Sequence, residues 1–181
     1  SKARTKRMTD RPAVMICGHG SRDDAAIEEF NSLAVHLRKR LPDHDVESGF
    51  LEFAKPIIRT GLDKLKKRGA KKIVCLPGML FAGGHVKNDL PSEINNFGAE
   101  NPDIEMVFGR ELAIDSKLLG AARDRVEEAL NEAGDHIARK DTLLMVVGRG
   151  TNDSDANSNV SKVARMLWEG MGFGWAEVSF S

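Results

Sequence analysis

The chain has 181 residues, a hydrophobic content of 41% and an aromatic content of 6%, with no tyrosine. This hydrophobic content is sufficient for a packed core, so a disordered chain is not the default expectation. The scarcity of aromatic rings argues against a stacking platform for nucleic acid or sugars. The formal net charge is zero, yet residues 1–12 contain five basic residues and one acid. We expect this stretch to be a basic, disordered N-terminal arm that binds no nucleic acid.

Two cysteines, Cys17 and Cys75, both lie in apolar runs. We expect them to be buried thiols in a reducing compartment. No apolar stretch approaches the length of a membrane-spanning helix, and residues 1–12 lack the apolar segment of a signal peptide. We therefore expect a cytoplasmic protein without a membrane partner.

Short apolar runs alternate with helical patterns along the chain. Strands are predicted at 13–17, 46–51, 72–76 and 104–108, and helices at 24–40, 56–68, 89–99 and 115–133. This alternation is typical of a parallel sheet covered by helices on both faces. The predicted fold is α/β, with a doubly wound, four-stranded parallel sheet in the order 2-1-3-4 inside a first lobe spanning residues 13–137.

A second strand–helix–strand pattern repeats the first. Residues 15–51 align with residues 145–181 at a constant offset of 130 and without a gap, and nine of the 37 aligned positions are identical. Both segments have the order Gly-x-Gly-[Ser/Thr]-x-Asp directly after a predicted strand, which favours an internal duplication. We expect residues 141–181 to be the beginning of a second, similar lobe that is incomplete and has an edge strand in need of cover.

Three potential metal ligands follow the ends of three predicted strands. His19 follows the first strand, Glu52 the second and His85 the third. Ligands of doubly wound sheets bind beyond the carboxyl ends of the strands, where the strand order reverses. Because adjacent strands lie about 4.8 Å apart and imidazole binds metals at about 2 Å, both histidines could reach one ion. The pair Gly83-Gly84 would let a flat ligand approach the backbone.

These residues also have simpler interpretations. His19 could cap a turn, and Glu52 could pair with Lys55 or cap the following helix. The segment GHGS at 18–21 is also compatible with an anion-binding turn at a helix N-terminus. A metal-binding carrier module and a flavodoxin-like binder of phosphate or flavin therefore remain open alternatives.

Four segments together resemble the CbiX-type sirohydrochlorin chelatases, which belong to the class II tetrapyrrole metal chelatases. They are GHGSRD (18–23), FLEFAKPII (50–58), LPGMLFAGGHVKNDLP (76–91) and the repeated GRGTNDSDAN (148–157). The chain is similar to the long, internally duplicated members of that family. The resemblance implies that His19 and His85 hold the incoming metal, that Glu52 assists, and that sirohydrochlorin, a planar macrocycle with eight carboxylates, lies between two lobes.

The resemblance also implies an activity, that of a lyase which inserts divalent cobalt into sirohydrochlorin with release of two protons, in cobalamin biosynthesis. The alternative within the family is iron insertion on the route to sirohaem. No tightly bound cofactor is expected, because cobalt, or iron or nickel in its place, is a substrate. We expect the chain to pair either as a homodimer or through its incomplete second lobe.

Neutral imidazoles suit late first-row metals, and a carboxylate can accept the pyrrole protons. Because protons compete for the imidazoles, activity is expected to fall below about pH 6. Arg149 replaces histidine in the repeat, so the second lobe should lack this metal site, although an arginine there can bind a carboxylate. The expected substrate-binding residues are Ser21, Arg22, Gly83, Gly84, Lys87 and Arg149.

Overall fold

The structure is a computed structural model that describes residues 11–134 and 138–181. The side chain of His85 and most of the basic arm expected over residues 1–12 lie outside the described part of the chain. The chain forms two compact units that divide between Leu112 and Ala113.

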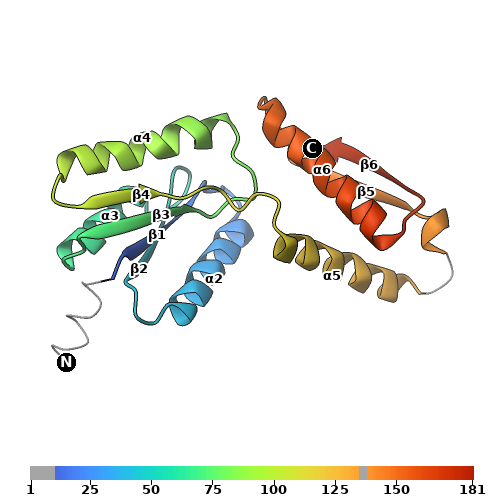
Figure 1. Cartoon of the computed structure of the whole chain (residues 1–181), viewed down its shortest axis with the longest axis horizontal. Helices are drawn as coiled ribbons and strands as arrows, with labels where there is room; N and C mark the ends of the chain where they lie inside the picture. The colour runs from blue at the N-terminus through green and yellow to red at the C-terminus, as the bar shows by residue number, and fades with distance from the viewer. Residues whose placement is uncertain (1–10, 135–137) are drawn as a thin grey trace. The chain divides into compact units, whose positions relative to one another are not determined.

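The first unit contains a four-stranded parallel sheet in the order β2-β1-β3-β4 (Figure 1). Every residue of β1 is buried, as expected for a central strand with helices on both faces. The predicted fold class and strand order are therefore confirmed. The strands are β1 (Ala13–Gly18), β2 (Val46–Phe50), β3 (Lys72–Pro77) and β4 (Glu105–Phe108).

Helices cover both faces of this sheet, with α2 on one face and α3 and α4 on the other (Figure 1). Successive side chains of a strand point to opposite faces. Val14 and Ile16 accordingly pack in the core beneath α2, while Met15 and Cys17 pack in the core beneath α3 and α4. The helices are α2 (Asp24–Arg40), α3 (Ile58–Lys67) and α4 (Gly84–Glu100).

Helix α4 begins earlier than the sequence pattern predicted. The pattern placed a helix at 89–99, whereas α4 begins at Gly84 and contains Pro91 in its interior. A proline normally lies in the first turn of a helix, so Pro91 obscures the true start. Because α4 begins at Gly84, the backbone of His85 lies in the first turn of this helix.

The two cysteines are free thiols in the core of the first unit, as predicted. A hydrogen bond with Cys75, together with burial, raises the pKa of the Cys17 thiol well above its ordinary value. The thiolate is the form that binds metals. Cys17 is therefore suited to packing and unsuited to metal binding.

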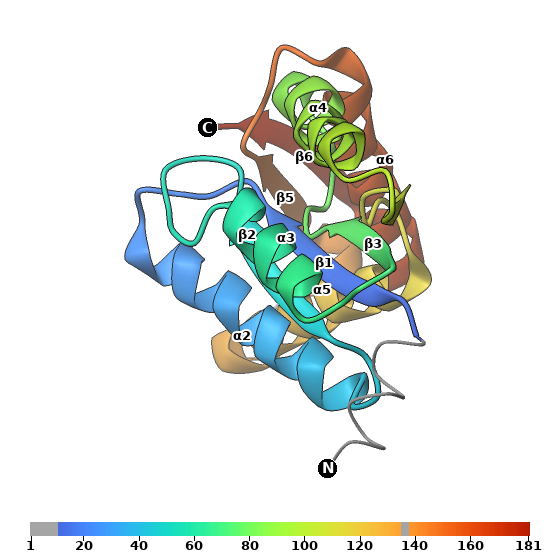
Figure 2. The same ribbon diagram turned by 90° about the vertical axis from the view of Figure 1, so that its left-hand side faces the viewer.

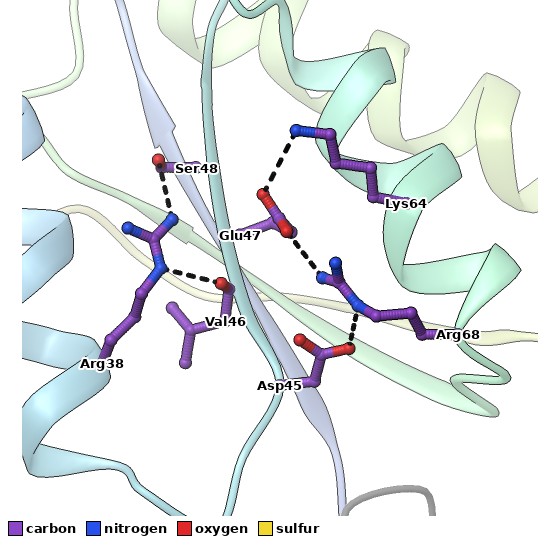
Figure 3. A network of polar contacts seen from close by, with 7 residues as sticks. All are labelled: Arg38, Asp45, Val46, Glu47, Ser48, Lys64 and Arg68. Carbon is purple, nitrogen blue, oxygen red and sulfur yellow. Dashed lines mark hydrogen bonds and ion pairs between the residues drawn. The ribbon is translucent and has the colours of Figure 1, made fainter.

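Arg38 of α2 covers the open side of the edge strand β2 (Figure 3). Its Nε donates to the Val46 carbonyl at 3.0 Å, and its Nη2 donates to the Ser48 hydroxyl at 3.4 Å. An unpaired carbonyl on an edge strand is a template for another strand. Arg38 therefore protects this edge while it joins β2 to α2.

Arg68, at the end of α3, binds the same strand from the other face (Figure 3). Its Nε donates to Asp45 and its Nη2 to Glu47, each at 2.6 Å, and Lys64 lies 4.0 Å from Glu47. These carboxylates are mostly covered, with side chains 19% and 15% exposed. The edge strand is thus fastened to helices on both of its faces.

The second unit is built on a two-stranded parallel sheet of β5 and β6. Its core contains Leu167, Met171 and Phe173, with Leu119 and Leu130 of α5 packed against them. We expected α5 to belong to a first lobe that ends at residue 137, and this boundary stays a prediction; in the structure, α5 is grouped with the second compact unit. The elements are α5 (Ser116–Ala133), the 3-10 helix η1 (Arg139–Asp141), β5 (Leu143–Gly148), α6 (Ser154–Met171) and β6 (Trp175–Phe180).

The duplication seen in the sequence is reproduced in the backbone. The Leu51 N–H donates to the Gly18 carbonyl at 2.8 Å, and the Ser181 N–H donates to the Gly148 carbonyl at 3.0 Å. These two bonds are related by the same offset of 130 residues that aligns the sequences. Further matching pairs are Asp23 and Asp153 as helix N-caps, and Gly20 and Gly150 with positive φ.

One face of β5 exposes apolar side chains. Leu143, Met145 and Val147 are 51%, 52% and 62% exposed, whereas the matching face of β1 packs under α3 and α4.

No helix in the described ranges is both long and apolar enough to cross a membrane.

Candidate active site

The His19 and Glu52 side chains meet beyond the carboxyl ends of β1 and β2, where Figure 2 shows the two loops side by side. The Glu52 N–H donates to the His19 carbonyl at 3.0 Å, which extends the strand pairing into the loops. His19 Nε2 lies 3.2 Å from Glu52 Oε1, and the two side chains are 35% and 42% exposed. This edge of the sheet therefore presents an imidazole and a carboxylate together, open to solvent.

The two loops approach so closely that position 20 has no room for a side chain. Gly20 has a φ of 102°, and a Cβ there would lie 1.7 Å from the Glu52 carbonyl oxygen. Only glycine tolerates both this backbone conformation and this contact. The close approach fixes the backbone of His19 relative to that of Glu52.

The hydrogen bonds of His19 define what can lie between the two side chains. Its Nδ1 lies 3.2 Å from the Gly20 carbonyl oxygen. In the tautomer that carries its proton on Nδ1, this nitrogen donates to the carbonyl, and the lone pair on Nε2 faces the Glu52 carboxylate. Two acceptors at 3.2 Å attract each other only through a shared proton or metal ion. Two ligand atoms of one tetrahedral ion at about 2.0–2.2 Å stand about 3.3–3.6 Å apart, close to the spacing observed.

The loop after β2 also places an aromatic ring beside His19. Phe53 has a left-handed φ of 62° and is 54% exposed, and its ring centre lies 6.2 Å from that of His19. The Arg22 guanidinium carbon lies 5.1 Å from the centre of the Phe53 ring. Arg22 was expected near the site, but Phe53 had no assigned role, because nothing in a sequence marks a phenylalanine as left-handed.

The loop after β3 leads into the first turn of α4. Gly83 is the N-cap residue of α4 and Gly84 its first residue, and the Lys87 N–H donates to the Gly83 carbonyl at 3.0 Å. The side chain of His85 lies outside the described residues, so its meeting with His19 stays a prediction. Among the side chains that the structure does describe, no group of three or more His, Cys, Asp or Glu is placed to hold a metal.

Two other expected substrate-binding residues have different surroundings. The Ser21 hydroxyl accepts a hydrogen bond from the Asp23 N–H at 3.0 Å, so it supports the turn that opens α2. Arg149 follows β5 in the second unit, at the position that matches His19 in the repeat. The structure thus groups His19, Glu52 and Arg22 in the first unit and leaves Arg149 in the other.

A family model described as CbiX matches residues 13–129, which is more than half of the chain. The chain belongs to the CbiX family. The resemblance drawn from the four sequence segments is therefore confirmed, and the His19–Glu52 pair lies within the matched region.

Two curated relatives of this CbiX chain illustrate the similarity. It is 35% identical over 175 residues to the sirohydrochlorin cobaltochelatase of Priestia megaterium, covering 93% of the chain and 54% of the relative. It is 27% identical over 159 residues to the sirohydrochlorin ferrochelatase of Bacillus subtilis (strain 168), covering 88% of the chain and 59% of the relative. The chain thus spans between half and two thirds of the length of these relatives.

A solved structure of SirB from Bacillus subtilis with Fe³⁺ has a similar fold. The TM-score is 0.83 and the sequence identity 26%, and the match covers 94% of this chain and 65% of that one. The similarity therefore extends across nearly all of the chain and is not limited to the four-stranded sheet.

Proposed function

We propose that the chain carries the metal-insertion site of a sirohydrochlorin cobaltochelatase, a lyase that exchanges two pyrrole protons for one divalent cobalt ion. The main structural support for this proposal is the 3.2 Å separation of His19 Nε2 and Glu52 Oε1 at an open edge of the sheet. The cobaltochelatase that is 35% identical to the chain supports sirohydrochlorin as the macrocycle and cobalt as the metal.

The two side chains have the chemistry that insertion requires. An imidazole nitrogen and a carboxylate oxygen bind late first-row ions and leave further coordination positions for pyrrole nitrogens. During insertion two pyrrole N–H bonds break and metal–nitrogen bonds form, so two protons must leave. Once the ion has moved to the macrocycle, Glu52 and His19 Nε2 can accept protons. Their exposure lets both ion and protons exchange with solvent.

We infer that His85 supplies a second imidazole, because β3 is the other neighbour of β1 and the loop 78–83 joins the end of β3 to the start of α4. Arg22 would bind a substrate carboxylate, with the backbone at Gly83 and Gly84 admitting the macrocycle and Lys87 adding positive charge. Arg149, which lies in the second unit, would also bind a substrate carboxylate. We place the reaction in the cytoplasm, as the unpaired thiols suggest, and propose no tightly bound cofactor.

Cobalt insertion into sirohydrochlorin, followed by absorbance, tests this function. His19→Ala and His85→Ala should each lower the rate by about 100-fold or more. His36→Ala is a matched control, because the His36 ring binds the Ser32 carbonyl of α2 at 2.8 Å and lies on an exposed helix face. Near-normal turnover in His19→Ala, or equal losses in His36→Ala, would contradict the proposal.

Iron is the alternative metal, because a ferrochelatase is also among the relatives and the same ligand atoms accept both ions. Competition between Co²⁺ and Fe²⁺ in one assay decides between them. A carrier module, by contrast, would bind cobalt and release it without forming the metallated macrocycle.

A further inference from the structure

We propose that Phe53 is a positioning residue that holds Arg22 where its guanidinium meets a carboxylate of the tetrapyrrole. The geometry behind this is the stacking of Arg22 on a ring that also lies beside His19. The inference rests on the proposed function and assigns one part of it, the recognition of substrate charge, to a residue that performs no chemistry itself.

The backbone of Phe53 is held in a conformation that phenylalanine rarely adopts. Its φ is 62°, and the Ala54 N–H donates to the Glu52 carbonyl at 2.8 Å across it. A three-residue turn with this bond and a positive φ is the rarer and more strained kind of γ-turn. The turn reverses the chain directly after Glu52, which brings the ring back toward His19.

Burial does not explain why a phenylalanine lies at this strained position. The residue is 54% exposed, so more than half of its surface faces solvent. Glycine or asparagine would adopt the same φ with less strain. Residues held in strained backbone conformations concentrate at binding and catalytic sites, and Phe53 directly follows Glu52.

Arg22 is the group that the ring holds. Its guanidinium carbon lies 5.1 Å from the ring centre, within the range of a cation–π contact. Among the residues that the structure describes, no carboxylate forms an ion pair with Arg22. A guanidinium stacked on an aromatic face keeps its N–H edge available, and that planar edge matches a carboxylate.

The arrangement therefore has two neighbouring functions. His19 and Glu52 face the metal-exchanging centre of the macrocycle, while Arg22 presents positive charge to a carboxylate on its rim. Phe53 contacts both parts and sets the direction of Arg22. Loss of the ring should leave the positive charge of Arg22 in place but allow its guanidinium to adopt many orientations. Substrate binding should then weaken more than the insertion step slows.

The test compares Phe53→Leu, Phe53→Tyr, Arg22→Ala and the double variant Arg22→Ala/Phe53→Leu. Leu33→Ala is the control, because Leu33 is an exposed apolar residue of α2. Metal-free binding of sirohydrochlorin is measured by fluorescence titration, and KM and kcat are measured for cobalt insertion. Phe53→Leu should raise Kd and KM for sirohydrochlorin about tenfold, the size of one charge-assisted contact, while kcat stays within about twofold.

Coupling between the two residues is the more specific outcome. The double variant should be no worse than Arg22→Ala alone, because Phe53 acts through Arg22, and Phe53→Tyr should bind like the unmodified chain. Phe53→Gly, which adopts the turn without strain, should lose the same binding while its melting temperature moves by less than about 5 °C.

The results also separate this inference from the proposed function. If the unmodified chain inserts cobalt and Phe53→Leu binds sirohydrochlorin equally well, the role of Phe53 is wrong and the chelatase function stands. Additive losses in the double variant, or a fall in kcat without a change in KM, would also overturn it. If the unmodified chain neither binds sirohydrochlorin nor inserts cobalt, the proposed function itself fails.

Discussion

His19 Nε2 lies 3.2 Å from Glu52 Oε1, and a backbone hydrogen bond from the Glu52 N–H to the His19 carbonyl joins the same two residues. A contact between two side chains as exposed as these contributes at most about 1 kcal/mol to stability, even where both are charged. The backbone bond therefore sets the position of the pair, and either side chain can be changed without moving the loops.

Glu52→Gln should abolish most of the activity and leave the fold intact. The amide keeps the shape of the side chain but is a poor metal ligand and cannot accept a proton. We expect the rate of cobalt insertion to fall by about 100-fold or more, with an unchanged melting temperature. Glu105→Gln, which breaks an exposed ion pair with Lys72 at 2.8 Å, should leave the rate unchanged, and equal losses in both would argue against a role for Glu52.

Gly20→Ala should destabilise the chain and inactivate the site. The added methyl group would lie 1.7 Å from the Glu52 carbonyl oxygen at a φ of 102°, so the two loops must separate. We expect the free energy of unfolding to fall by about 2 kcal/mol or more, measured by urea denaturation.

Gly120→Ala is the matched control for that substitution. A Cβ at Gly120, inside α5, would meet nothing within 4 Å. Alanine is the better helix former, so this variant should gain about 0.5–1 kcal/mol. An equal change in the free energy of unfolding for both substitutions would show that the close approach of the two loops is not the reason for a glycine at position 20.

Arg68→Ala should destabilise the edge of the sheet. Asp45 and Glu47, only 19% and 15% exposed, would lose hydrogen bonds of 2.6 Å each, and Lys64 replaces them poorly from 4.0 Å. The expected loss in the free energy of unfolding is about 1–2 kcal/mol.

An ion pair with the same N–O distance but exposed side chains shows whether burial, and not distance alone, determines the effect of Arg68→Ala. Arg125 and Glu128 also lie 2.6 Å apart, but their side chains are 74% and 56% exposed. Arg125→Ala should cost less than about 0.5 kcal/mol. Similar losses for both arginines would mean that coverage of the edge strand adds nothing.

The ion pair between Arg59 of α3 and Glu100 of α4 should show a defined pH dependence. The hydrogen bond from Arg59 holds the pKa of the Glu100 carboxyl below its ordinary value. The pair therefore stabilises the fold fully above about pH 4.3, and this contribution is lost as the pH falls through the lowered pKa.

Thermal melts of Glu100→Gln from pH 7 to pH 2 test this dependence. The variant should melt slightly below the unmodified chain at pH 7, and the difference should vanish at the acid end. Glu29→Gln, on an exposed face of α2, should show no comparable pH dependence. A difference for Glu100→Gln that persists at pH 2 would contradict the role of its charge.

The strand order and the approach of His19 to Glu52 could be predicted from the sequence for the same reason. Apolar runs locate the strands, and alternation with helices makes them parallel, so the loops that follow adjacent strands must emerge at one edge. The location of the pair therefore follows from topology. Its hydrogen bonds do not, because they depend on the close approach of Gly20 to the next loop.

Other features could not be predicted because they depend on packing partners. The apolar pattern of α5 shows that Leu119 and Leu130 need a surface to cover, but not that the surface is α6. The left-handed turn at Phe53 similarly leaves no local trace, since phenylalanine normally favours extended or helical backbone. Local patterns thus identify elements, and only tertiary structure assigns their neighbours.

The bond that closes the first repeat, from the Leu51 N–H to the Gly18 carbonyl, has its counterpart in the second, although His19 in one is Arg149 in the other. The turn therefore folds independently of the side chain it displays. The side chain at this position can therefore differ between the two repeats while the backbone of the turn stays the same. A protein engineer could replace Arg149 with residues that carry new donor groups without changing that backbone.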